Sequence, residues 1–369
     1  MRMKKEESLK NLVTFKPNKL EPIHNWYWYK EGYSKQFVEL FLRRFRPKKD
    51  SLVLDPFAGV GTTLLTCKEY GIPSVGFDVS PLTVLISKVK TRDYDLETME
   101  KYVKQALKWK FERPDQIPKD KWLRRIFSKY ALEDIVFFRR KIFEIKDEKV
   151  RDFLLVGLMD SSLKASYAYK DGAFVKVKKK GVPPVRKLFH YKIRKMLKDL
   201  RNSDIRQTPV QIDIGDARDI KLKDNSVDFV ITSPPYLNKI EYTSIYKTEY
   251  ALFFEQPETK LRSFVGERVT DEPGFPDLCP IAQAYFKDMT LVLKELYRVC
   301  KPGAKLAIVI GGGCFPDGVI DVDTRIANIA EDIGFKLDRI LVARETWCTK
   351  KRTIKIGKMR ESVVILKKT

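Results

Sequence analysis

The sequence predicts an α/β fold, a sheet whose strands are joined by crossover helices, interrupted by one basic and largely helical insertion. Apolar runs of strand length alternate with longer amphipathic segments. A glycine-containing turn follows the first of these runs and opens a helix. Residues 91–208 break the alternation with a long basic stretch of helical character. We therefore expect one domain formed by residues 1–90 and 209–369, with 91–208 inserted into it.

The expected elements follow from the apolar runs and from the signals that end them. The first strand covers 51–54 and the second covers 74–77, with a helix at 62–70 between them. The remaining elements are, in chain order, strands at 210–214 and 227–231, a helix at 282–299 closed by Lys301-Pro302-Gly303, a strand at 305–310, a helix at 324–333 capped by Asp323 and ended by Gly334, and two strands around 340–343 and 362–366 joined by a basic connection.

The charge of the chain favours a polyanionic partner. Its 369 residues are 43% hydrophobic, which supports a substantial core, and they carry 72 Lys and Arg against 49 Asp and Glu, a net charge of +23. Residues 91–208 hold 31 basic and 17 acidic side chains, and 162–206 hold 14 basic and three acidic ones. Two interpretations stay open for the basic stretch: contact with a phosphate backbone, or a solvated helical face with a lysine-rich loop.

Cysteine and histidine usage argues against a metal centre. The five cysteines are an odd number without CxxC spacing, which argues against a zinc site and a disulfide framework and favours a reducing compartment. His24 and His190 are too far apart to indicate a metal site. The N-terminus lacks an apolar signal region, and no apolar run is long enough to span a bilayer. We expect a cytoplasmic protein that binds neither a membrane nor a metal.

Three expected strands end in an acidic residue, namely Asp55, Asp78 and Asp216. Gly59 and Gly61, in the turn after the first strand, let the backbone approach a ligand closely. No lysine follows the second glycine, which argues against a phosphate-binding P-loop. Asp78 is placed to accept the ribose hydroxyls of a nucleoside, and Asp216 to accept from an adenine amino group. The pattern therefore indicates an adenosine site that does not depend on phosphates.

A rigid corner follows the fourth expected strand, where Ser233, Pro234, Pro235 and Tyr236 stand in succession. The two prolines fix φ at consecutive positions and remove two backbone donors, so the corner presents acceptors with little freedom to move. An ordinary strand-ending turn would explain the tetrapeptide if it stood alone. Together with the glycine turn upstream, the corner indicates a site that holds a small group.

These stretches together resemble the S-adenosylmethionine-dependent amino-methyltransferases that modify DNA. The N-terminal segment 24–34 also resembles the family segment that precedes the cofactor loop and helps to close over the methionine end. The four motifs that carry the resemblance are DPFAGVGTT at 55–63 for the cofactor loop, FDVSP at 77–81 for the ribose site, GDA at 215–217 for the adenine site and TSPPY at 232–236 for catalysis.

The resemblance covers about 1–90 and 209–369, and it implies a fold and a cofactor. The family fold is a mostly parallel, Rossmann-like sheet of seven strands whose last strand is antiparallel. Its first and fourth strands are central neighbours, so that the cofactor loop and the catalytic motif face each other. The cofactor would be S-adenosyl-L-methionine, bound by Asp55, Pro56, Phe57, Ala58, Gly59, Gly61, Thr62, Asp78, Val79, Asp216, Ala217, Tyr29 and Ser34.

The catalytic residues that the resemblance implies are Ser233, Pro234, Pro235 and Tyr236. An exocyclic base amine is a poor nucleophile, because its lone pair is delocalised into the ring. The Ser233 hydroxyl and the Pro234 carbonyl would accept its two hydrogens and draw the nitrogen toward tetrahedral geometry, while Tyr236 would stack on the base. Methylation of cytosine at carbon 5 would instead need a thiolate in a Pro-Cys motif, which the family places where Ser-Pro-Pro-Tyr stands here.

The residue before the two prolines separates the possible targets. The family usually has Ser there for cytosine N4 and Asp or Asn for adenine N6, so Ser233 favours cytosine N4. The enzymatic alternatives are an adenine-N6 DNA methyltransferase and an RNA base-amine methyltransferase. A further alternative is a nucleic-acid-binding protein that has lost catalysis, against which the intact motifs argue.

Double-stranded DNA is the expected partner, and a restriction endonuclease is a candidate companion. A base inside a duplex cannot present its amine to a pocket, so the target base must be flipped out or single-stranded. The insertion 91–208 is the candidate for duplex binding and target recognition, as is the stretch 255–280. Backbone contacts and a merely solvated hairpin connection are equally open for the basic tail residues Lys350, Lys351, Arg352, Lys355, Lys358 and Arg360.

Overall fold

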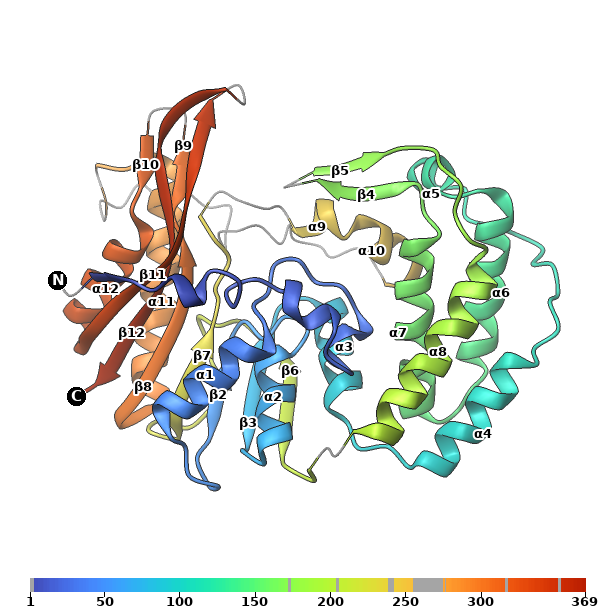
Figure 1. The fold of residues 1–369 in the computed structure, drawn as a ribbon, viewed down its shortest axis with the longest axis horizontal. Helices are drawn as coiled ribbons and strands as arrows, with labels where there is room; N and C mark the ends of the chain where they lie inside the picture. Colours follow the sequence, from blue (N-terminus) through green and yellow to red (C-terminus); the bar gives the residue numbers. More distant parts are fainter. Residues whose placement is uncertain are drawn as a thin grey trace.

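In the computed structural model, the described residues are built around one sheet of eight strands. The structure describes residues 3–171, 174–203, 206–237, 242–254, 275, 277–315, 318–350 and 353–369. Figure 1 shows the sheet, whose strands follow the order β1-β11-β12-β8-β7-β2-β3-β6. The bounds of these strands are β1 Met3–Lys5, β2 Val53–Asp55, β3 Ser74–Asp78, β6 Val210–Ile214, β7 Val227–Thr232, β8 Cys300–Gly311, β11 Phe335–Lys350 and β12 Ile354–Lys368.

Strand β12 runs antiparallel to both of its neighbours, β11 and β8, and the other pairs in the sheet are parallel. The predicted sheet with an antiparallel last strand is confirmed, and the short β1 adds one strand at its edge. The predicted central neighbours, β2 and β7, pair through Val53 with Phe229 and through Leu54 with Val230. Their carboxyl ends therefore meet at one edge of the sheet, at the point where the strand order reverses.

Helices cover both faces of the sheet. Alternate residues of a strand point to opposite sides, and apolar residues on both sides are buried under helices. Val53 and Ile231 pack against α1, whereas Leu54 and Val230 pack against α11 and α12. Helix α3 packs with α2 beside β6. The bounds of these helices are α1 Lys35–Phe45, α2 Thr62–Tyr70, α3 Pro81–Thr91, α11 Pro280–Val299 and α12 Val322–Ile333.

The start of helix α12 differs from the prediction. The helix begins at Val322 with Asp321 at its N-cap position, so the prediction that Asp323 caps it was wrong. The Asp323 carboxylate instead accepts from the Arg360 guanidinium at 2.8 and 2.9 Å and from the Ser362 hydroxyl at 2.7 Å. These partners lie on β12, so packing of the helix onto the sheet sets its start. The predicted end at Gly334 is confirmed.

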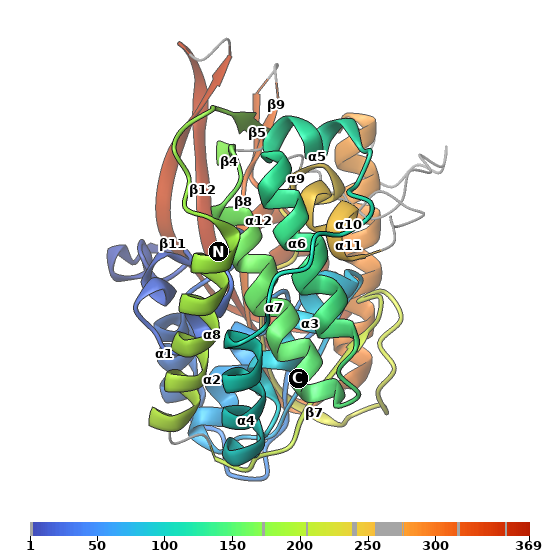
Figure 2. The same ribbon diagram turned by 90° about the vertical axis from the view of Figure 1, so that its right-hand side faces the viewer.

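The residues between β3 and β6 form the helical right-hand side of Figure 1, and Figure 2 shows α6, α7 and α8 side by side. Their core is shared with the rest of the chain. Trp26 packs edge-on against Phe153 of α7 at 5.4 Å, and Tyr250 of α10 belongs to the same cluster. The bounds are α4 Leu96–Leu107, α5 Lys121–Ile126, α6 Lys129–Phe143, α7 Glu148–Lys164, β4 Ala168–Asp171, β5 Phe174–Val177, α8 Val185–Asn202, α9 Tyr242–Ile245 and α10 Lys247–Phe253.

Strands β11 and β12 continue past the end of β8 as a two-stranded hairpin. β8 pairs with β12 between Lys367 and Glu361, whereas β11 and β12 stay paired out to Lys350 and Ile354. A short hairpin of β9 (Gly313–Phe315) and β10 (Gly318–Ile320) lies beside them. A disulfide joins Cys314 of β9 to Cys348 of β11. This bridge corrects the expectation from cysteine spacing, because the fold brings together two residues that are 34 positions apart.

Three 3-10 turns, η1 Glu7–Leu9, η2 Lys16–Lys19 and η3 His24–Trp26, shape the N-terminal segment. Across the described helices, none combines the length and the apolarity that crossing a membrane requires. In the described ranges, no three His, Cys, Asp or Glu side chains gather as metal ligands would.

Candidate active site

The ends of β2 and β7 are joined through a buried carboxylate. Asp55, which is 2% exposed, accepts from the Thr232 hydroxyl at 2.6 Å, from the Tyr33 hydroxyl at 2.9 Å and from the Phe57 backbone N–H at 3.2 Å. Burial raises the pKa of Asp55 to about 6, and the hydrogen bonds oppose that rise. The first residue of the predicted cofactor loop and the first residue of the predicted catalytic motif are thus in direct contact.

Tyr33 ties the N-terminal segment to the same point. Its hydroxyl is 2.5 Å from the Thr63 hydroxyl at the start of α2 and 3.1 Å from the Ile231 carbonyl of β7, so that carbonyl and Asp55 share its one O–H hydrogen. The ring is 4% exposed. Sequence reasoning did not select Tyr33 or Thr63, although Tyr33 lies in the segment 24–34 that carried the resemblance. A buried tyrosine among polar side chains becomes visible only when the strands are assembled.

The glycine turn has the backbone geometry that a close ligand approach needs. Gly59 and Gly61 adopt φ of +50° and +78°, a region that other residues rarely occupy. A Cβ on Gly59 would lie 3.2 Å from the Tyr29 ring, which covers the turn and stacks on Tyr246 at a centroid distance of 5.5 Å. The turn therefore forms a small cradle under an aromatic residue that the sequence had already placed in the site.

Asp78 stands at the end of β3, beside the turn. Its carboxylate accepts from the Gly59 backbone N–H at 2.8 Å and from the Ser80 backbone N–H at 2.9 Å. Desolvation raises its pKa, and these backbone donors oppose the rise. A carboxylate has about four acceptor positions, so Asp78 can accept further donors such as ribose hydroxyls beside these backbone groups. The cradle and this acid fit an adenosine-containing cofactor.

The predicted adenine acid is already engaged. The Asp216 carboxylate forms a two-pronged ion pair with Arg218, whose nitrogens Nε and Nη2 lie 3.0 and 2.7 Å from its two oxygens. Arg218 also reaches Asp288 of α11 at 2.9 Å. Hydrogen bonds and the charge of Arg218 hold the pKa of Asp216 below its usual value despite partial burial. An adenine amino group would therefore have to share this carboxylate with the arginine.

The remaining predicted cofactor residues fall into two groups. Ser34 is fully buried at the N-cap of α1, where its hydroxyl accepts from the Phe37 N–H at 3.2 Å and donates to the Leu12 carbonyl at 3.0 Å. Ser34 therefore caps α1 and joins it to the chain at Leu12, a structural role that is separate from its predicted contact with the cofactor. The others line the strand ends, with Val79 43% exposed, Phe57 half-buried and Pro56, Ala58, Thr62 and Ala217 buried.

The corner at 233–236 holds two acceptors that no described residue occupies. Neither the Ser233 hydroxyl nor the Pro234 carbonyl has a hydrogen-bond partner within the part of the chain that the structure describes. The neighbouring acceptors are occupied, because the Pro235 carbonyl receives the Tyr285 hydroxyl at 3.0 Å and the Ile231 carbonyl receives Tyr33. The corner is held from both sides while its middle stays available.

Tyr236 is fixed at both ends of its side chain. Its hydroxyl donates to Glu361 of β12 at 2.8 Å, and the second oxygen of Glu361 pairs with Arg344 of β11. A Cβ on Gly311 would lie 2.5 Å from the Tyr236 ring, so only glycine fits at the end of β8. Glu361, Arg344 and Gly311 were missed by sequence reasoning, since they come from the far end of the chain.

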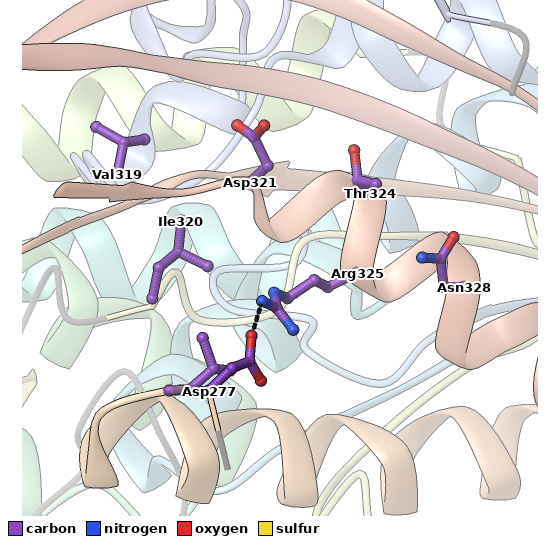
Figure 3. A pocket seen from close by; sticks show the side chains of 8 residues that line it. Asp277, Val319, Ile320, Asp321, Thr324, Arg325 and Asn328 are labelled. Atoms are coloured by element: carbon purple, nitrogen blue, oxygen red, sulfur yellow. Dashed lines mark hydrogen bonds and ion pairs between the residues drawn. The ribbon is translucent and has the colours of Figure 1, made fainter. Parts of the chain in front are cut away.

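A separate pocket lies on another part of the described surface. Figure 3 shows that it opens between β10 and the first turns of α12, with the Arg325–Asp277 ion pair crossing it. None of the predicted site residues lines it. Its lining residues are Asp277, Leu278, Val319, Ile320, Asp321, Thr324, Arg325 and Asn328.

Comparison with known proteins agrees with the fold and the motifs. Residues 15–89 match a family model described as a DNA methylase. Type II methyltransferase M.BsoBI of Geobacillus stearothermophilus is 26% identical, over 91% of this chain and 83% of that protein. Type II methyltransferase M.AvaI of Nostoc sp. is 27% identical, over 92% and 85%. M.MjaII of Methanocaldococcus jannaschii is 28% identical over 54% of this chain and 40% of its own length.

The fold, the strand-end site and these matches define a methyltransferase enzyme. More narrowly, they confirm the resemblance to the S-adenosylmethionine-dependent DNA amino-methyltransferases, of the kind that work in restriction and modification. S-Adenosyl-L-methionine is therefore the cofactor, and the matches support DNA as the substrate. They do not separate cytosine N4 from adenine N6 as the methylated atom.

Proposed function

We propose that this protein methylates the N4 amine of cytosine in duplex DNA at a specific short sequence, on a base that it flips out of the helix. The observation that supports this most directly is that the Ser233 hydroxyl and the Pro234 carbonyl, at the end of β7, accept no hydrogen bond from any residue that the structure describes. The neighbouring strand β2 carries the cofactor loop, and Asp55 and Thr232 join the two. The serine favours cytosine through the family pattern described above.

In this proposal the corner binds the base amine in the geometry in which its nitrogen can attack the methyl group. Ser233 and Pro234 accept the two N–H bonds, which localises the nitrogen lone pair and points it toward the cofactor loop. Tyr236, held by Glu361, supplies a flat surface for the base. The sulfonium of the bound cofactor supplies an already activated methyl group. Transfer leaves a positive charge on the methylated nitrogen, which then loses a proton to solvent, so the corner needs no charged catalytic base.

We assign the cofactor contacts to groups at the strand ends that can still accept a ligand. Asp78 holds the ribose hydroxyls, the backbone at Gly59 and Gly61 lies against the cofactor, and Tyr29 closes over it. Val79 offers an exposed apolar surface to the adenine ring. Asp55 acts through Thr232 and Tyr33 as a positioning residue, because protein donors already engage its carboxylate.

The insertion 91–208 is assigned to duplex binding, with residues 178–180 as its clearest exposed charge. Lys178, Lys179 and Lys180 follow β5 and are all exposed. Part of the remaining charge of the insertion is paired, as in Arg186 with Asp134 and Lys192 with Asp160, both at 2.9 Å. The three adjacent lysines at 178–180 would contact phosphates beside the β4–β5 hairpin. The other candidate, 255–280, lies largely outside the described residues.

The test is to identify the methylated nucleoside directly. DNA and, separately, RNA are incubated with labelled cofactor and digested, and the products are resolved by mass spectrometry. We expect N4-methylcytosine from duplex DNA. N6-methyladenine would transfer the proposal to adenine, and label only in RNA would overturn it. Ser233→Ala should lower kcat by about a hundredfold or more while leaving the Kd of the cofactor nearly unchanged. A protein that binds duplex but no cofactor in calorimetry would favour the non-enzymatic alternative.

A further inference from the structure

The outer part of the β11–β12 hairpin carries an exposed tryptophan flanked by lysines. Trp347 is 49% exposed, and the Nζ atoms of Lys355 and Lys358 lie 4.7 and 5.4 Å from the centroid of its ring. Residues 344–360 hold seven basic side chains and one acidic one, a net charge of +6. An aromatic surface set among cations suits a ligand that has both phosphates and flat rings.

One face of this outer hairpin is backed by protein. Cys348, the neighbour of Trp347, is buried and bonded to Cys314 of β9. Val319 of β10 lies 2.9 Å from the place where a Cβ on Gly357 would stand. Since successive strand residues point to opposite faces, Trp347 lies on the face that β9 and β10 leave open. The hairpin is therefore a braced ribbon with one available face.

The same ribbon starts at the catalytic corner. Glu361, the residue where β12 leaves β8, accepts from the Tyr236 hydroxyl and pairs with Arg344 on β11. In Figure 1 the outer part of β11 and β12 rises at the top of the view, beyond the edge of the sheet where β7 ends. Its outer strand, Ile354–Arg360, extends for roughly 20 Å at about 3.3 Å per residue. The ribbon therefore begins next to the corner and is long enough to reach DNA on either side of a base held there.

We propose that the outer β11–β12 hairpin is a DNA-binding ribbon that lies against the duplex beside the flipped base. Lys355 and Lys358 contact backbone phosphates, and Trp347 packs on the sugars or base edges that border the groove. A two-stranded ribbon has dimensions that the major groove accepts. This inference rests on the proposed function and adds a second contact element, distant in sequence from the insertion.

The structure also shows which of the basic residues of 350–360 can contact DNA phosphates. The Arg360 guanidinium is bound by Asp323 at 2.8 Å and by Asp321 at 3.0 Å, so Arg360 anchors the ribbon and is not a phosphate ligand. Glu345 lies 4.0 Å from Lys358 and offsets part of its charge. Lys351 and Arg352 lie outside the described residues. Lys355, Lys358 and Trp347 are therefore the residues to test.

The experiment measures binding of a fluorescent mixed-sequence DNA duplex by anisotropy at several salt concentrations. Lys355→Ala/Lys358→Ala should weaken binding by roughly tenfold and lower the slope of log affinity against log salt by about 2, one for each phosphate contact. Trp347→Ala should weaken binding with the slope unchanged, because no charge is removed. The matched control is Lys336→Ala/Lys367→Ala, two exposed lysines that face each other at the opposite end of the same two strands. It should bind as the wild type does.

Two readouts guard against indirect effects. Each variant should keep the wild-type Kd for the cofactor and the wild-type melting temperature. In the ribbon variants alone, the KM for duplex should rise while kcat stays within about twofold. Wild-type affinity and salt slope in Lys355→Ala/Lys358→Ala would overturn the ribbon assignment while leaving the proposed function intact. Wild-type protein that bound duplex RNA and no duplex DNA would instead overturn the proposed function.

Discussion

The Asp55 carboxylate and the Thr232 hydroxyl are joined by a buried hydrogen bond of 2.6 Å that crosses from β2 to β7. Asp55 opens the cofactor loop, and Thr232 immediately precedes Ser233. In the proposed mechanism, the distance between the bound methyl donor and the target amine would therefore depend on this contact between the two strands. Tyr33 supports it by donating to the second oxygen of Asp55.

Thr232→Val tests this positioning role, because it removes the hydroxyl and keeps the shape of the side chain. The buried carboxylate loses a partner, which should lower the free energy of unfolding by about 1–3 kcal/mol. We expect kcat to fall by about tenfold, since a small misplacement of reacting groups is costly, with the Kd of the cofactor changed less than twofold. Thr290→Val, which removes a helix contact to the Phe286 carbonyl, is the control. Equal losses of kcat in both variants would contradict the positioning role.

Asp55 also gives stability a pH dependence of definite sign. Burial raises its pKa from 3.8 to about 6, so the folded protein holds this proton more tightly than the unfolded chain does. This contribution to the free energy of unfolding is complete below pH 3.8 and is lost as the pH rises through about 6. The loss amounts to about 3 kcal/mol. Urea unfolding of the wild type and of Asp55→Asn between pH 4 and 7 measures it. The stability of the wild type relative to the variant should fall across this range, and a constant difference would count against it.

Gly311→Ala should disturb catalysis through Tyr236. The added Cβ would stand 2.5 Å from the Tyr236 ring, so the ring must move away from the corner. Overpacking of this kind costs about 1–3 kcal/mol of stability. We expect a kcat reduced by about tenfold with an unchanged Kd for the cofactor. Gly181→Ala is the control, since no heavy atom lies within 4 Å of the new Cβ. If kcat survives in Gly311→Ala, the placement of the ring is not important for the reaction.

Local pattern was sufficient to predict most of the sheet. The helix expected at 62–70 coincides with α2, and the strands expected at 74–77 and 210–214 agree with β3 and β6. Apolar runs, turn glycines and strand-end acids act within a few residues, so one sequence is enough to reveal them. The pairing of β2 with β7 came from the family resemblance, and the structure confirms it.

Side-chain engagement could not be predicted in this way, because it depends on residues that are far apart in sequence. Asp216 was selected for adenine, yet only the folded chain shows Arg218 and Asp288 around it. Tyr236 was selected as an aromatic surface, yet its partner Glu361 is 125 positions away. The assignment of cofactor and catalytic residues stays a prediction, and these contacts show where it must be tested.

The Cys314–Cys348 bridge provides a last test that links stability to binding. It closes a loop of 34 positions, and in the chain-entropy account its loss should lower the free energy of unfolding by up to about 4 kcal/mol. Urea unfolding with and without reductant should show this loss in the wild type and no reductant effect in Cys314→Ala/Cys348→Ala. Cys279→Ala, at an exposed free cysteine, is the control and should respond to reductant as the wild type does.

The bridge also fixes β9 to the outer part of β11, where Trp347 and the two lysines stand. Reduction should therefore weaken duplex binding more than cofactor binding, because the predicted cofactor loop follows β2, which β7 and β8 separate from β12 in the sheet. Titration of five free thiols in the unreduced, denatured protein would show that the bridge is not formed. In that case reductant should change neither affinity, and the bracing of the ribbon would rest on Val319 and Gly357 alone.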